Sequence, residues 1–167
     1  MVKSMYKKLI LVLLPLALSA CIGLNHPSEN VELYSRNNVF PVDAGRIDKV
    51  IVDGLAILVG EDGSRIGIHY ESLGGIESNV SPKDYFKLIF GRGTASNKDV
   101  LSTRTVIYKN IDFSEEISTG DITAYHLIYN NGIKKVVFHD QRNPDVYGVI
   151  EAQGRDAVRV FSEMRHR

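Results

Sequence analysis

The sequence predicts an α+β fold in which an antiparallel sheet is packed by two or more helices. Asn131-Gly132 separates two alternating apolar segments, which is typical of a β-hairpin. Residues 81–90 and 155–164 have the periodicity of amphipathic helices. The order of strands, helix, strands and helix then favours α+β over a parallel α/β architecture.

Three strands are expected in the first half of the domain. Residues 47–52 and 55–59 are rich in β-branched side chains and flank Asp53-Gly54, a pair typical of hairpin turns. Residues 65–70 alternate between apolar and polar after a turn at 61–63. The preceding stretch, 31–44, is ambiguous and is interpreted as further tether or as an irregular lead-in.

A helix is expected to begin after Ser81 and to run to about Phe90. Serine accepts hydrogen bonds from free backbone N–H groups at a helix start, and Pro82 suits the first helical position. Beyond it, residues 103–108 are predicted to form a strand and residues 112–120 an acidic loop.

The last third has the clearest pattern. Residues 121–129 and 133–139 form the predicted hairpin, and residues 146–152 form a further strand. In the terminal helix, 155–164, Val160, Phe161 and Met164 share one apolar stripe. The basic residues 165–167 are interpreted as a favourable charge at the carboxyl end of that helix.

This ending resembles the αβα sandwich of the PsbP-like fold over about the last fifty residues. The shared pattern is a meander, then a strand, a glycine and a terminal helix. It has no diagnostic motif, so the resemblance implies nothing about function.

Residues 1–20 have the pattern of an export signal. Lys3, Lys7 and Lys8 precede the uncharged segment 9–18. That segment fits the apolar core of a signal peptide and is shorter than the roughly 20 residues of a membrane-spanning helix.

The residues that follow, Leu18-Ser19-Ala20-Cys21, resemble the lipobox of bacterial lipoproteins. The resemblance implies that a signal peptidase recognises Leu18, Ser19 and Ala20, and that acyl chains anchor the chain to a membrane through Cys21. Ile22 stands where an aspartate would imply the inner membrane, so the outer membrane is expected, with the inner membrane as the alternative.

These signals divide the chain into three parts. Residues 1–20 are the expected signal peptide, residues 21–45 the lipidated cysteine with its tether and lead-in, and residues 46–167 a single α+β domain. Cys21 is the only cysteine, so no disulfide is expected in the domain.

Charge narrows the class of partner. Without the three lysines of the signal, 17 basic and 20 acidic side chains remain, for a net charge of −3. No basic cluster of the kind that binds phosphate backbones is present in the sequence, so nucleic acid is not expected as a partner.

His126 and His139 are the weak candidates for metal ligands. With a two-residue turn at Asn131-Gly132 they would share one sheet face as diagonal neighbours, about 7–8 Å apart. A three-residue turn with a bulge would put them on opposite faces. A metal site needs three or four converging ligands, and the sequence identifies no third, so no metal and no cofactor are expected.

No catalytic residue is identified, because the sequence contains no nucleophile elbow and its one thiol is assigned to lipid. The sequence therefore favours a non-enzymatic binding domain that is lipid-anchored and faces the periplasm. Its partner would be an envelope or secreted protein, as for an immunity or envelope-accessory protein. The alternatives are an envelope enzyme with an unrecognised active site and a structural component of a secretion or envelope machine.

Overall fold

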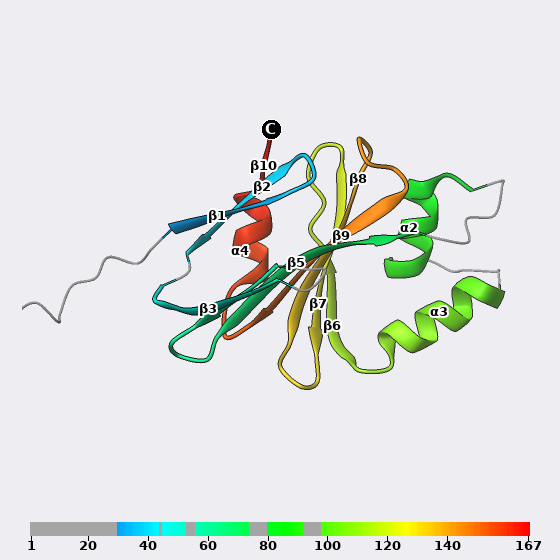
Figure 1. Ribbon diagram of the computed structural model, residues 1–167. Coiled ribbons are helices and arrows are strands. Elements are labelled where there is room, and N and C mark those ends of the chain that lie inside the picture. The colour runs from blue at the N-terminus through cyan, green and yellow to red at the C-terminus, as the bar shows by residue number, and fades with distance from the viewer. Residues whose placement is uncertain (1–29, 44, 53–55, 74–79, 92–97) are drawn as a thin grey trace, which may run out of the picture.

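The computed structural model describes residues 30–43, 45–52, 56–73, 80–91 and 98–167 (Figure 1). Leu18, Ser19, Ala20 and Cys21 lie outside these residues, as does the predicted turn at Asp53-Gly54. Within the described ranges the chain is mixed and mostly sheet, with ten strands and three helices. No helix in these ranges has the length and apolarity needed to cross a membrane.

A seven-stranded sheet forms the body of the molecule, and all of its neighbouring strands are antiparallel. The strand order is β3-β4-β5-β9-β8-β7-β6. The strands are β3 (Ile47–Val52), β4 (Ala56–Gly60), β5 (Arg65–Ser72), β6 (Ile111–Glu116), β7 (Ile122–Tyr129), β8 (Lys134–Asp140) and β9 (Val146–Gln153). The predicted antiparallel sheet is therefore present, although sheet outweighs helix more than the α+β class suggests.

A second, three-stranded sheet corrects the interpretation of residues 31–44. They form a hairpin of β1 (Asn30–Ser35) and β2 (Asn38–Asp43), to which β10 (Arg165–His166) adds at the other edge. Phe40 and Val42 are almost fully buried, so this hairpin belongs to the core and is no tether. Pro41 is tolerated within β2 because β10 pairs only with residues 38 and 39.

The C-terminal basic residues also have a different role from the one predicted. Arg165 and His166 pair with β2, and the backbone N–H of Arg167 donates to the carbonyl of Asn37 at 2.9 Å. The side chain of Arg165 also pairs with Glu32 of β1. The chain end therefore extends a sheet edge and does not cap a helix.

Three helices lie in the described residues: α2 (Pro82–Phe90), α3 (Lys98–Tyr108) and α4 (Ala157–Ser162). Helix α2 begins as predicted, with the Ser81 side chain accepting from the N–H of Asp84 and proline in the first turn. Helix α4 is shorter than the predicted 155–164. Its N-cap is Asp156, whose carboxylate accepts from two backbone N–H groups.

The prediction of a strand at 103–108 is wrong, because these residues are the second half of α3. Val100 is buried, and Ile107, seven residues later, packs against the core beneath α2. Seven residues are two helical turns, so both side chains lie on one face of α3. Tertiary contact thus overrides the β-branched character of the segment. The predicted loop at 112–120 is also partly wrong, since β6 occupies 111–116.

The seven-stranded sheet buries side chains on both faces. On the first, here called the α4 face, Phe138, Ile150 and Ala124 pack with Phe161 of α4 and Phe40 of β2. On the second, here called the α2 face, residues of β7, β8 and β9 pack with α2: Tyr125, Leu127, Val137 and Val149 with Phe86, Ile89 and Phe90. In Figure 1, α2 and α3 lie beyond one end of the sheet, away from α4.

Candidate functional site

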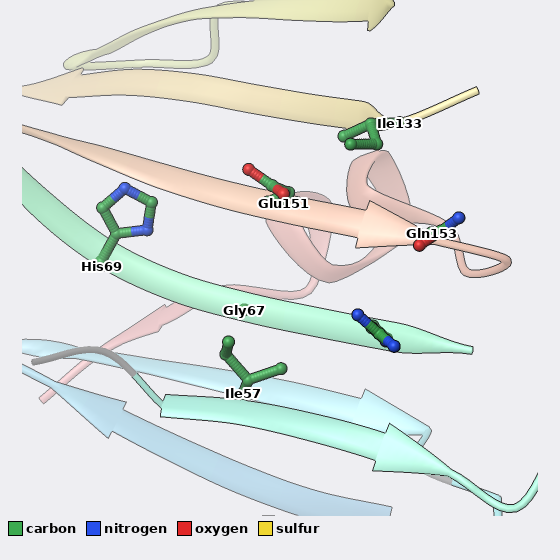
Figure 2. Close-up of a pocket in the computed structure, with 7 residues that line it drawn as sticks. Ile57, Gly67, His69, Ile133, Glu151 and Gln153 are labelled. Carbon is green, nitrogen blue, oxygen red and sulfur yellow. The ribbon is translucent and has the colours of Figure 1, made fainter. Parts of the chain in front are cut away.

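A hollow lies on the part of the α2 face that α2 leaves uncovered. Along β9, Val149 is 3 % exposed beneath the helix, whereas the side chain of Glu151, two residues further on, is 39 % exposed. The hollow has a volume of about 230 Å³ and is lined by seven residues (Figure 2): Ile57, Arg65, Gly67, His69, Ile133, Glu151 and Gln153.

The hollow follows from the sheet register around Gly67. Ile57 of β4 and Glu151 of β9 pair directly with Gly67, on either side of it. Arg65 and His69 lie two residues away on the same strand, so they point to the same face. Gly67 has four neighbours with side chains and none of its own, and this leaves the space between them.

Glu151 and His69, two of the ionisable side chains around the hollow, are already paired with neighbouring side chains. Nζ of Lys135 lies 2.6 Å from Oε2 of Glu151, to which Lys135 is also opposite in the register. Nε2 of His69 donates to Oε1 of Glu71 at 3.0 Å, and the Tyr147 hydroxyl donates to the other oxygen of Glu71. Arg65 makes no hydrogen bond or ion pair through its side chain within the described part of the chain.

The acidity of Glu71 reflects these two donors. Burial is the largest single influence and acts to raise the pKa of this carboxyl group. The hydrogen bonds from Tyr147 and His69, together with electrostatic attraction from His69 and Lys135, outweigh burial, so the pKa of Glu71 is lowered. Burial, followed by the same hydrogen bond to Glu71, raises the pKa of Tyr147. Glu71 therefore stays ionised at neutral pH and holds the His69 ring in one orientation.

The chemistry of the hollow suits binding better than covalent catalysis. Among the lining residues that the structure describes, none carries a hydroxyl or a thiol. Nδ1 of His69 is buried and has no hydrogen-bond partner in the described residues, so a substrate has no access to it in this conformation. What the hollow offers is one apolar side chain on each of two opposite sides, Ile57 and Ile133, together with the guanidinium of Arg65 (Figure 2).

The two candidate metal ligands, His126 and His139, do not meet. The β7–β8 hairpin has a three-residue turn, with the N–H of Tyr129 donating to the carbonyl of Ile133. Gly132 takes the positive φ, +80°, that such a turn requires. His126 consequently lies opposite Val136 and His139 opposite Thr123, which puts the imidazoles on opposite faces of the sheet.

Each histidine has a structural environment of its own. His126 contacts the edge of Phe113 on the α4 face, and burial, followed by nearby Lys134, lowers its pKa. His139 is 1 % exposed, packs against Phe86 and donates from Nε2 to the carbonyl of Pro144 at 3.1 Å. In the described ranges no three histidine, cysteine, aspartate or glutamate side chains are grouped as a metal site would require.

The hollow is not predicted from the sequence, although one signal for it is present. Gly67 interrupts an otherwise alternating strand, and a glycine inside a strand often marks a place where another group approaches closely. The partners of Gly67 on β4 and β9 could not be found from local sequence, because β9 is about eighty residues away along the chain.

Comparison with known proteins adds no relative: the chain matches no family model, no curated protein and no solved structure.

Proposed function

We propose that this chain is a membrane-tethered α+β binding domain, and that its partner docks on the α2 face at the hollow around Gly67. The tether is the acyl-modified Cys21 that the lipobox-like residues 18–21 imply. The expected location is the periplasm-facing side of the outer membrane, with the inner membrane as the alternative. The partner is an envelope or secreted protein, as for an immunity or envelope-accessory protein.

The size and setting of the hollow carry the proposal. Pockets for drug-sized ligands and cofactors typically measure about 300–1,000 Å³. At about 230 Å³, this hollow suits one or two side chains of a larger partner. Ile51 pairs with Ile57 across β3 and β4 and is 41 % exposed, so the apolar surface at Ile57 continues beyond the hollow. An exposed aliphatic strip beside a side-chain-sized hollow is typical of protein interaction surfaces.

Site-specific photocrosslinking tests the proposal in the cells that naturally make the protein. A benzophenone amino acid replaces Gln153 at the rim of the hollow, or Val106 of α3 as the control. Val106 is 75 % exposed and lies outside the hollow, so it reports random encounters. The expected result is a discrete protein adduct from position 153 that is absent from position 106.

Gly67→Val then links the adduct to the hollow. Valine favours strand conformation, and its side chain fills the space that Gly67 leaves. The variant should therefore stay folded in urea titrations and lose the adduct from position 153. An adduct of equal yield in Gly67→Val, or equal adducts from positions 153 and 106, contradicts docking at this site.

An envelope enzyme is the second candidate, and the ring orientation of His69 is the observation that favours it. A carboxylate that fixes an imidazole tautomer is a common part of acid–base sites. The buried Nδ1 of His69 and the lack of a hydroxyl or thiol among the described lining residues place this candidate second.

A further inference from the structure

We infer that the hollow receives the carboxylate side chain of a glutamate or aspartate from the partner protein, with Arg65 as its anchor. This inference rests on the proposed function and specifies the chemistry of the docking segment.

The charged side chains that line the hollow indicate the charge of its ligand. Two ionisable residues besides Arg65 line the hollow, and the first of them, Glu151, is paired with Lys135 at 2.6 Å. His69 is bonded to Glu71 at 3.0 Å, and Glu71 also accepts from Tyr147. Within the described residues Arg65 is the lining group whose charge has no counter-ion, so the complementary ligand is an anion.

The register leaves the guanidinium of Arg65 open to that anion. Arg65 of β5 pairs directly with Gln153 of β9, and directly opposed residues have Cβ atoms about 4.5–5.5 Å apart. The guanidinium presents donors in a planar fork that matches a carboxylate. Both side chains are exposed, so they are accessible to a partner.

The walls favour a carboxylate on a short aliphatic stem. Ile57 and Ile133 are half-buried and line the hollow beside Arg65. They offer apolar contact to the methylene groups of an acidic side chain while its charged end reaches Arg65. A volume of about 230 Å³ accommodates such a side chain, with little room for a larger anion such as a nucleotide.

The test uses nuclear magnetic resonance of the full chain in a zwitterionic detergent. The probes are N-acetylglutamate N-methylamide and its glutamine counterpart, which differ only in the carboxylate. The expected result is saturable shifts of the Gly67 and Gln153 amide signals with the glutamate probe, at roughly millimolar concentration. The glutamine probe should bind at least about tenfold more weakly, since it lacks the charge.

Two arginine variants distinguish direct binding by Arg65 from a nonspecific effect of the protein's net charge. Arg65→Gln should weaken the response to the glutamate probe by about tenfold or more. Arg46→Gln removes an equal charge from an arginine already paired with Glu61 at 3.2 Å, and it should leave the response unchanged. Equal responses to the two probes, or a full response in Arg65→Gln, would overturn the inference.

The two proposals fail in different ways. If the probes fail while position 153 still forms its adduct, docking at the hollow stands and the carboxylate chemistry is wrong. If the adduct is absent while the probes bind as expected, the anion site stands and the docking proposal is wrong.

Discussion

Gly148→Ala is the substitution for which the structure sets the sharpest expectation. Gly148 of β9 lies directly opposite Phe138 of β8. A Cβ built on Gly148 would lie 2.1 Å from Cζ and 2.4 Å from Cε1 of Phe138. Carbon atoms at optimal separation are about 3.5–4.0 Å apart, so the ring would have to move by more than about 1 Å.

The surroundings of Phe138 leave no room for that movement. Phe138 is fully buried, and its ring centroid lies 6.1 Å from that of Phe40, 5.8 Å from that of Tyr70 and 5.8 Å from that of Phe161. Adding volume to a well-packed core costs about 1–3 kcal/mol. Because the obstructing group is a rigid ring held on three sides, we expect a loss near the upper end, about 3 kcal/mol.

Urea unfolding measures the loss, and two comparisons make it specific. Gly67→Ala, at a glycine of the neighbouring strand β5 that lines the hollow, should cost clearly less than Gly148→Ala. In a Phe138→Leu background, Gly148→Ala should cost at least about 1 kcal/mol less than in the wild type. A Gly148→Ala protein within about 0.5 kcal/mol of the wild type, or no relief in the Phe138→Leu background, would refute the reasoning.

Four further substitutions test other parts of the structure. Gly132→Val should cost roughly 1 kcal/mol or more in urea titrations, because φ is +80° there; unchanged stability would contradict the turn. Phe161→Ala should cost about 3–5 kcal/mol as a core truncation, and a loss below about 1 kcal/mol would place the side chain outside the core. Cys21→Ser should remove the acyl mass from the N-terminal peptide and release the protein from membranes; unaltered membrane association, with no acyl mass on the wild type, would sink the lipoprotein proposal. The pKa of Glu71 is lowered in the fold, so its ionised form stabilises the protein above the ordinary carboxyl pKa of 4.5, and this contribution is lost as the pH falls through the folded value. The stability gap between wild type and Glu71→Gln should therefore narrow between pH 7 and about pH 3, and a constant gap would show that the two hydrogen bonds do not act through ionisation.

Local sequence predicted the elements whose signals lie within a few residues. The Ser81-Pro82 start of α2 and the strands on either side of Asn130-Asn131-Gly132 are in place. The buried stripe of the terminal helix is confirmed at Val160 and Phe161. Caps and turns depend on backbone groups nearby in the chain, so the residues that form them are visible in the sequence.

The errors lie where distant segments decide the conformation. Residues 98–108 form a helix that buries Val100 and packs Ile107 against the core of the α2 face. Residues 30–43 form a hairpin whose side chains Phe40 and Val42 are buried against the α4 face of the sheet. In both segments the intrinsic preference was weak or misleading, and burial against partners far along the chain determined the outcome.

The candidate site divides in the same way. The sequence by itself predicts a turn at Asn131-Gly132. The length of that turn sets the strand register, and the register decides whether His126 and His139 share a face of the sheet. The three-residue turn shifts the pairing by one position and separates them, since side chains alternate with a period of two. The sequence also predicts an export-type start ahead of its one cysteine, Cys21, because such a signal is a pattern of consecutive residues. Only the tertiary structure decided that α2 stops short of Glu151, and that Gly67 meets Ile57 on one side and Glu151 on the other. Arg65 and Gln153 become neighbours through strand pairing between residues about ninety positions apart. That pairing is stabilised by the two cores above and below the sheet as a whole, and no local pattern around Arg65 or Gln153 encodes it.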